Sequence, residues 1–346
     1  MQLREALRSA LASLQESNVP SAGLASELLL MHVLGRDRAY LYTYPECDLS
    51  PEAAARYFEL IAERATGKPT QYITGHQEFW GLDFEVTPDV LIPRPETEHL
   101  VEAVLELVRG GAHADSIARD NRPPVPLDRA AGQKGRGKPR PYEHGNREEP
   151  KHADRSAASR RILDVGTGSG CIALALASEL PKATIVATDL SRGALQVAQR
   201  NARRLKLSDR VHFVEADLLS CFIAESRTPG FDFVVSNPPY VSMDEIGSIQ
   251  REVRDFEPRL ALGGSGDGVE IYGRLFAQSL SVLRPGGHVA VEIGYNQSGA
   301  VLKLLEDGWE SSAVRPDLAG IPRVVLAQKR PLVCQPSAIS GQQACN

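Results

Sequence analysis

Strand-like and helix-like segments alternate through the second half of the chain, and this alternation constrains the fold more than any other feature. Most apolar, β-branched runs are followed by a turn and then by a stretch whose apolar residues recur at helical spacing. This order is typical of parallel strands joined by crossover helices, so it predicts an α/β fold with a doubly wound, mostly parallel sheet. A turn joins the last two strands, which predicts one antiparallel strand at the sheet edge. The strands are expected at 161–165, 184–188, 211–215, 231–236, 288–293, 309–314 and 324–328.

The first part of the chain has a helical pattern instead. Apolar residues at helical spacing predict helices over 3–16 and 21–34, and Ser50 is well placed to begin a third. A β-hairpin and a helix over 96–108 follow. The expected organisation is a helical domain over 1–75, a β-hairpin with a connecting helix over 76–108, and the doubly wound domain over 161–329.

Apolar periodicity is absent between these parts, over 109–160, and again in the tail over 330–346. Both segments are polar, and the first is rich in Gly, Pro, Lys and Arg, so neither can bury enough apolar surface to offset chain entropy. We expect both to be disordered. A basic arm for RNA is the alternative for 109–160, but the only aromatic residue within it is Tyr142.

Charge and composition limit the possible partners. Residues 1–108 contain 17 Asp and Glu against 8 Lys and Arg, a net charge of −9, which suits a basic protein better than duplex DNA. No apolar run approaches the length of a membrane span, and the N-terminus lacks a signal-peptide pattern, so we expect no membrane association and a cytoplasmic location. The five cysteines are scattered, which disfavours a disulfide framework and a zinc site, and we expect no bound metal.

A glycine-rich turn follows the strand expected at 161–165. Its glycines permit positive φ and a close approach to a ligand, and the next helix presents its N–H groups there. The third glycine of a dinucleotide-binding fingerprint would fall at Cys171, so a nicotinamide or flavin site is disfavoured. A tight turn without a ligand is the alternative. The turn consists of Gly166, Thr167, Gly168, Ser169 and Gly170.

Two carboxylates follow the next two strands. Asp189 lies 23 residues after Gly166, where it could accept hydrogen bonds from both ribose hydroxyls of a nucleotide. Its alternative role is a helix cap, for which Ser191 is the better candidate, and this would leave Asp189 free. For Asp217, capping of the following turn is nearly as good an explanation as ligand binding.

The most specific motif is the tetrapeptide Asn237-Pro238-Pro239-Tyr240, directly after the strand at 231–236. Its prolines hold a stiff turn at the carboxyl end of a strand, which is where open α/β sheets bind ligands. The tetrapeptide resembles the motif of methyltransferases that act on the planar NH₂ nitrogens of adenine, cytosine and glutamine. Such a nitrogen is a poor nucleophile, and the Asn237 oxygen with the Pro238 carbonyl could accept its two N–H groups, while Tyr240 stacks on it. A turn without function is the alternative.

Together these motifs resemble the PrmC/HemK family, the peptide chain release factor N5-glutamine methyltransferases. The Asp-x-Gly-x-Gly-x-Gly spacing from Asp164 resembles the first motif of class I S-adenosylmethionine-dependent methyltransferases. The resemblance covers 1–108 and 160–329, and it implies a Rossmann-like, seven-stranded sheet with a helical domain for substrate recognition. Further supporting stretches are 69–75, 78–81, 92–98, 257–262 and 283–287.

The resemblance also implies a reaction. A methyl group would pass from S-adenosyl-L-methionine to the side-chain amide of the glutamine in the Gly-Gly-Gln motif of class 1 release factors, with S-adenosyl-L-homocysteine as product. Catalysis would fall to Asn237, Pro238 and Tyr240, with Pro239 also binding substrate. The implied cofactor-binding residues are the five residues of the glycine turn, Asp189, Asp217 and Leu218 (both beside the adenine), and Asn237.

Other functions remain open at this level. A glutamine methyltransferase of a ribosomal protein would differ only in its partner, and a non-catalytic binding module could keep the same fold. An N6-adenine DNA methyltransferase would need a basic recognition region, which the folded parts lack. The sequence does not decide the oligomeric state or the roles of Arg94, Glu98, Glu257 and Arg259.

Overall fold

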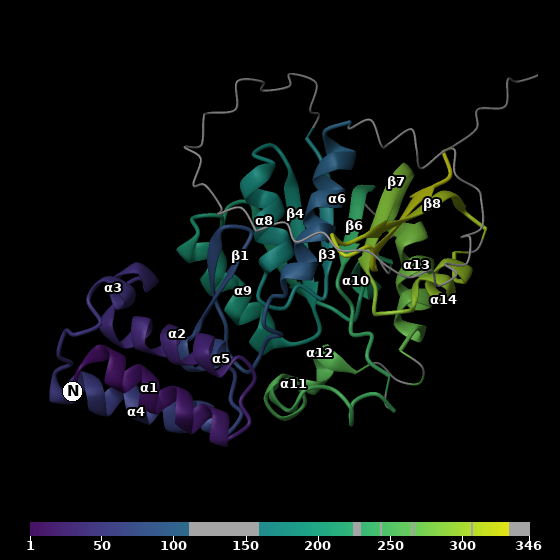
Figure 1. Ribbon diagram of the computed structural model, residues 1–346. Helices are drawn as coiled ribbons and strands as arrows, with labels where there is room; N and C mark the ends of the chain where they lie inside the picture. The colour runs from purple at the N-terminus through teal and green to yellow at the C-terminus, as the bar shows by residue number, and fades with distance from the viewer. Residues whose placement is uncertain are drawn as a thin grey trace, which may run out of the picture.

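The computed structural model describes residues 1–110, 159–223, 230–242, 244–263, 266, 268–305 and 307–331. A helical bundle lies beside a larger body built on a sheet (Figure 1). The disordered segments predicted over 109–160 and 330–346 lie almost entirely outside the described residues, so both stay predictions.

Three longer helices form the bundle: α1 (Leu3–Glu16), α2 (Ala22–Leu34) and α4 (Pro51–Ala65). Ser50 caps α4 as expected, because its side chain accepts a hydrogen bond from the Ala53 N–H at 3.1 Å. Two short helices, α3 (Arg38–Thr43) and α5 (Thr70–Thr74), were not predicted, because five or six residues are too few to show a helical period. The buried core of the bundle includes Leu3, Ala6, Ala10, Leu14, Leu29, Leu30, Tyr57, Leu60 and Ile61.

A hairpin of β1 (His76–Phe79) and β2 (Leu82–Glu85) follows the bundle. Its two turn residues both have positive φ, which matches the twist of a tight two-residue β-turn. The chain then runs through a 3₁₀ turn, η1 (Pro95–Thr97), into α6 (Glu98–Val108), which packs on the sheet. The hairpin and η1 therefore link the two parts of the chain.

The seven-stranded sheet has the order β5-β4-β3-β6-β7-β9-β8. The first five strands in this order are mutually parallel, and β9 runs in the opposite direction to the other six strands, which confirms the doubly wound, mostly parallel fold. The strands are β3 (Arg161–Val165), β4 (Thr184–Asp189), β5 (Val211–Glu215), β6 (Phe231–Ser236), β7 (Leu283–Glu292), β8 (Trp309–Pro316) and β9 (Pro322–Lys329).

The prediction that the antiparallel strand lies at the edge is wrong. β9 lies between β7 and β8, and β8 forms the edge. The difference follows from burial, because β9 carries four consecutive buried residues from Val324 to Ala327, whereas most residues of β8 keep some exposure. The more apolar strand takes the position that is covered on both sides.

Helices cover both faces of the sheet. On one face α6 and α8 (Cys171–Glu179) pack into one core, with α9 (Arg192–Arg204) beside them, and on the other α13 (Glu270–Val282) and α14 (Ser298–Lys303) pack into a second. A short helix, α10 (Ser220–Ile223), follows β5, and α11 (Arg251–Phe256) and α12 (Arg259–Leu262) follow β6.

The segment with α11 and α12 joins the bundle to the sheet domain (Figure 1). Arg64 of α4 forms a largely buried ion pair with Glu252 of α11. Phe256 packs against the small cluster that contains Tyr72 of α5. These contacts place the bundle at the carboxyl edge of the sheet, next to the candidate site.

Candidate active site

The carboxyl ends of β3 and β6 are fixed side by side. Val165 and Ser236, the last residues of these strands, are register partners, and the Ser236 hydroxyl donates to the Val165 carbonyl at 2.7 Å. The glycine turn and Asn237 therefore leave the sheet at neighbouring points. The sequence placed them some seventy residues apart, and the parallel pairing brings them together.

Backbone hydrogen bonds hold the glycine turn against β4. The N–H groups of Gly166 and Thr167 both donate to the Thr188 carbonyl, at 2.8 and 2.9 Å. Gly166 and Gly168 have φ of +71° and +56°, and a Cβ on either would meet no atom of the described residues within 4 Å, so both border open space. Gly170 is different, because a Cβ there would lie 3.1 Å from the Leu174 side chain, and its role is packing.

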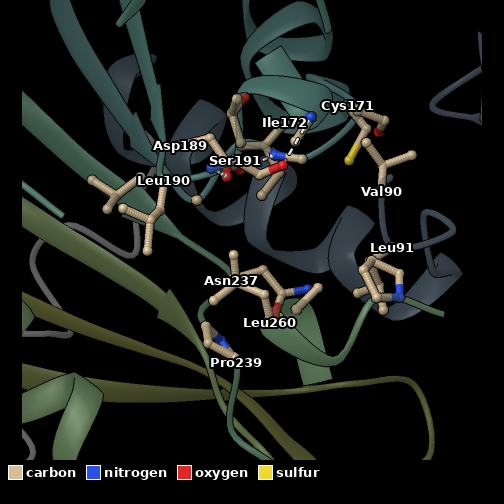
Figure 2. A pocket seen from close by; sticks show the side chains of 18 of the residues that line it. Val90, Leu91, Cys171, Ile172, Asp189, Leu190, Ser191, Asn237, Pro239 and Leu260 are labelled. Atoms are coloured by element: carbon tan, nitrogen blue, oxygen red, sulfur yellow. Dashed lines mark hydrogen bonds between the residues drawn. The ribbon is translucent and has the colours of Figure 1, made fainter. Parts of the chain in front are cut away.

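A cavity of about 320 Å³ lies between the glycine turn, the end of β4 and the turn after β6. In Figure 2, Asp189, Leu190 and Ser191 lie across the cavity from Asn237 and Pro239. A volume of this size is typical of a small-molecule site. Within the described chain, the lining does not include Gly170, Pro238 or Tyr240. The predicted site residues that line it are Gly166, Thr167, Gly168, Ser169, Asp189, Asp217, Leu218, Asn237 and Pro239.

Asp189 lies at the end of β4, with both carboxylate oxygens engaged. Oδ2 accepts from the Gly168 N–H and Oδ1 from the Ser191 N–H, each at 2.8 Å. Ser191 is indeed the helix cap, with its hydroxyl accepting from the Ala194 N–H at 3.2 Å, but Asp189 is not free as expected, because it braces the glycine turn. Burial raises the pKa of Asp189, and hydrogen bonds from the backbone oppose this. Two oxygens have about four acceptor sites, so the carboxylate keeps acceptor capacity for a ligand.

Asp217 and Leu218, which follow β5, lie at the rim of the cavity. The Asp217 carboxylate forms a half-exposed ion pair with Arg274 at 2.6 Å, rather than the side-chain cap that was considered. Leu218 has a φ of +51°, a conformation rare outside glycine. Strained residues of this kind concentrate at ligand sites, and Leu218 lines the cavity.

Asn237 is the first residue after β6, and its side chain is oriented by the wall of the cavity. Its Nδ2 donates to the Thr97 Oγ1 at 3.1 Å, although the two residues are 140 positions apart. In the described chain, no hydrogen bond is recorded to Asn237 Oδ1 or to the Pro238 carbonyl. The Asn237 oxygen is therefore an acceptor available at the cavity. The Pro238 carbonyl also keeps a free acceptor site, although Pro238 is not among the described residues that line the cavity.

Residues that follow β7 hold Tyr240 in place. Gln297 Nε2 donates to the Tyr240 carbonyl at 2.9 Å, and the ring lies so close to Gly294 that a Cβ there would be 2.9 Å from Tyr240 Cδ2. Burial raises the pKa of Tyr240 to about 12, so its hydroxyl stays protonated. Its stacking role stays a prediction.

Sequence reasoning missed three buried polar residues at the site. Asp164 accepts hydrogen bonds from Thr167 Oγ1 at 2.6 Å and from the Ala173 N–H at 3.2 Å, and so joins the glycine turn to α8. Burial raises its pKa to about 7. Glu292 ends β7, and burial raises its pKa to about 7, while hydrogen bonding from Thr97 and Asn237 acts in the opposite direction.

A usable signal existed for Glu292, since it is a lone charge in the apolar run 289–293, and such charges are rarely buried without a role. Thr97 had a signal only at the level of its segment, because 92–98 is one of the stretches that support the family resemblance. Its importance comes from a contact with a distant strand end.

The charged residues left open by the sequence are mostly structural. Glu257 is buried, accepts from Arg94 at 2.5 Å and from the Ile92 N–H at 3.3 Å, and so braces the segment before η1. Burial raises its pKa, and Arg94 opposes this. Glu98 accepts from the Trp80 N–H at 2.8 Å and holds the hairpin, whereas Arg259 is exposed at the start of α12.

A second cavity, of about 310 Å³, lies at the junction of the two domains. Its walls carry the two ion pairs Arg64–Glu252 and Arg94–Glu257. Arg94 lines both cavities, so the second one adjoins the first. The arrangement offers a polar surface beside the ligand cavity.

The described residues contain neither a helix suited to span a membrane nor a cluster of metal ligands. None of their helices combines the length and apolar character that crossing a bilayer requires. Across the same ranges, no group of three or more His, Cys, Asp or Glu side chains is placed to hold a metal ion.

Comparison with known proteins agrees with this geometry. Residues 5–75 match the PrmC N-terminal domain, and residues 151–307 match the methyltransferase small domain. The chain is 45% identical to a release factor glutamine methyltransferase from Koribacter versatilis, over 95% of this chain and 99% of that protein. It is 40% identical to a protein of the same name from Moorella thermoacetica, with the same two coverages. Because this identity extends through both the bundle and the sheet domain, the chain belongs to the family of release factor glutamine methyltransferases.

Proposed function

We propose that this chain transfers a methyl group from S-adenosyl-L-methionine to the N5 side-chain amide of the glutamine in the Gly-Gly-Gln motif of class 1 peptide chain release factors. The observation that carries the proposal is the orientation of Asn237. Its nitrogen is held by Thr97, so its oxygen is presented as an acceptor at the cavity, beside the glycine turn. Relatives with the name release factor glutamine methyltransferase support the same activity.

Asn237 and Pro238 bind the substrate amide. The Asn237 oxygen and the Pro238 carbonyl accept its two N–H groups, which fixes the nitrogen in one place and aims its remaining face into the cavity. The same two acceptors stabilise the positive charge that develops on this nitrogen during the reaction. Pro239 lines the cavity beside them, and Tyr240 stacks on the planar group.

The walls of the first cavity fit S-adenosyl-L-methionine. Gly166 and Gly168 leave open the space that side chains would fill, and with Thr167 and Ser169 they form the cradle, while Gly170 supports the turn by packing against Leu174. Asp189 accepts from the two ribose hydroxyls with its remaining acceptor sites, and the rim formed by Asp217 and Leu218 flanks the adenine. When bound, S-adenosyl-L-methionine supplies an electrophilic methyl group on a positively charged sulfur and leaves as S-adenosyl-L-homocysteine.

The protein does not need a strong general base for this reaction. The amide nitrogen becomes acidic as it is alkylated, so its proton can leave late to water. Positioning and exclusion of water therefore carry the catalysis. Apolar side chains at the cavity contribute to this exclusion, among them Leu190, Leu260 and Ile271.

The substrate protein docks where the helical bundle meets the sheet domain. The second cavity lies at this junction and shares Arg94 with the first, so a loop that enters the first cavity lies against the second. Residues 1–108 carry a net charge of −9, which favours a basic partner surface and makes the association sensitive to salt. Because release factors act in translation, we place the reaction in the cytoplasm, without membrane contact.

We infer further that DNA is not a substrate, because the acidic bundle offers few cations for phosphate groups. A labelled-methyl assay with release factor, ribosomal proteins and DNA in separate tubes tests the proposal. The expected result is label in the release factor alone, at the loop glutamine. Label that appears only in DNA or only in a ribosomal protein would overturn it.

A further inference from the structure

The side-chain amide of Asn237 can serve its proposed role in only one of two orientations. Its oxygen end accepts hydrogen bonds and its nitrogen end donates them, and the two ends have nearly the same shape. If the amide were turned over, Nδ2 would face the N–H groups of the substrate, and donor would meet donor. Something in the structure must therefore select the productive orientation.

Thr97 alone does not make this selection. Its hydroxyl lies against the Asn237 amide, and a hydroxyl can either accept from Nδ2 or donate to Oδ1. Thr97 is 2% exposed, in η1 between the two domains, so water does not compete for its hydrogen. The direction of the contact depends on where that hydrogen points.

Glu292 determines that direction. It is the last residue of β7, and because Ser236 of β6 is the register partner of Val291, Asn237 and Glu292 leave the sheet next to each other. Hydrogen bonding from Thr97 and Asn237 opposes the rise in the pKa of its carboxyl, and its buried Oε2 has no close hydrogen-bond partner among the described residues, so this oxygen can take the Thr97 hydrogen. Above the pKa of about 7 the carboxyl is ionised and only accepts, so the Thr97 hydrogen then points to Glu292, and the Thr97 lone pair is left for Asn237 Nδ2.

We propose that Thr97 and Glu292 are positioning residues that set the direction of the hydrogen bonds around Asn237 and thereby keep its oxygen toward the substrate nitrogen. The inference rests on the proposed function and adds two residues to it. Thr97 also lines the cavity, but the role proposed for both residues is exerted through Asn237, which faces the cavity in Figure 2.

The first test is Thr97→Val, which keeps the shape of the side chain and removes the hydroxyl, with Thr97→Ser as the matched control. In Thr97→Val the partly buried Asn237 Nδ2 loses the acceptor that holds it in the structure, so the overturned amide gains population at the expense of the productive one. We expect Thr97→Val to keep the wild-type affinity for S-adenosyl-L-methionine while its kcat falls about 5- to 100-fold. The kcat of Thr97→Ser should stay within about threefold of wild type. Equal losses in both variants would overturn the proposal.

A second readout separates orientation from packing. It compares binding of the full-length release factor with binding of a form whose loop glutamine is replaced by glutamate, a side chain that accepts but does not donate when ionised. Wild type should prefer the glutamine form, and Thr97→Val should reduce the ratio of the two Kd values by about tenfold or more. If both affinities fall equally, Thr97 only supports packing and the proposal is wrong.

Glu292→Gln provides an independent test, and it decides the matter if Thr97→Val does not fold. Glutamine places a donor group where the ionised Glu292 offers only acceptors, so above a pH of about 7 the same loss of preference for the glutamine form is expected. Cofactor affinity and the thermal midpoint show that the variant is folded, and an unchanged preference in folded protein would overturn the proposal. The proposed function fails differently, because wild-type protein would then leave the release factor unmethylated.

Discussion

Replacement of Asp189 by asparagine tests the cofactor site at its best-defined carboxylate. In the structure, one oxygen accepts from the Gly168 N–H and the other from the Ser191 N–H, each at 2.8 Å. Asparagine keeps one oxygen and replaces the other with an NH₂ group. Whichever way the new amide turns, a donor therefore faces one of these two backbone donors.

The expected loss of affinity follows from the number of acceptors. The substitution removes one of the two charge-assisted bonds proposed for the ribose hydroxyls, each of which contributes about 1.5–3 kcal/mol. The Kd for S-adenosyl-L-methionine should therefore rise roughly 10- to 150-fold. Glu215→Gln is the matched control, because Glu215 is not among the described residues that line the cavity and it only loses an exposed ion pair with Arg192, so the Kd should change by less than about fivefold.

Isothermal titration calorimetry of the two variants with S-adenosyl-L-methionine measures the difference. Urea denaturation in parallel checks that Asp189→Asn is folded, since the lost brace on the glycine turn also lowers stability. Binding within about twofold of wild type in folded Asp189→Asn would refute the assignment of this carboxylate to the ribose.

Three further outcomes are expected. Burial raises the pKa of Glu292 from 4.5 to about 7, so the free energy of unfolding of wild type falls as pH rises through this window. In urea denaturation, the free energy of unfolding of Glu292→Gln should increase by about 3 kcal/mol relative to that of wild type between these two pH values. A difference that stays constant with pH would contradict the assignment. Gly170→Ala should lower the free energy of unfolding by about 3 kcal/mol, because the added Cβ lies at a φ of +84° and contacts Leu174. Gly35→Ala, whose Cβ would meet no atom of the described residues, should lower it by only about 1 kcal/mol. Equal shifts in the thermal midpoint would show that the packing argument is wrong. Raising NaCl from about 50 to about 500 mM should weaken release factor binding by about tenfold or more but leave cofactor affinity nearly unchanged, and salt-independent binding would exclude charge-driven docking.

The sequence predicted the sheet well because its strands are apolar, short and separated by helical segments. β3, β4 and β6 appear close to the residues expected, and their carboxyl ends gather most of the predicted site residues around one cavity. The glycine turn and the Asn-Pro-Pro-Tyr turn could be located because each carries its chemistry within a few consecutive residues.

Features that depend on long-range pairing could not be predicted. The place of β9 inside the sheet depends on its burial relative to β8, and α11 and α12 are too short to show a period. The Thr97 contact with Asn237 joins residues 140 positions apart, and no local pattern encodes it. The expected disorder at 109–160 lies outside the described residues and stays a prediction.

The central claim is that Asn237 holds the substrate nitrogen for methyl transfer, and single-turnover kinetics of Asn237→Ala with saturating release factor and S-adenosyl-L-methionine tests it most directly. The rate of methyl transfer should fall about 100- to 1000-fold, as when a preorganised group is removed from a transition state, while cofactor affinity stays within about threefold of wild type. A transfer rate within about tenfold of wild type would contradict the account.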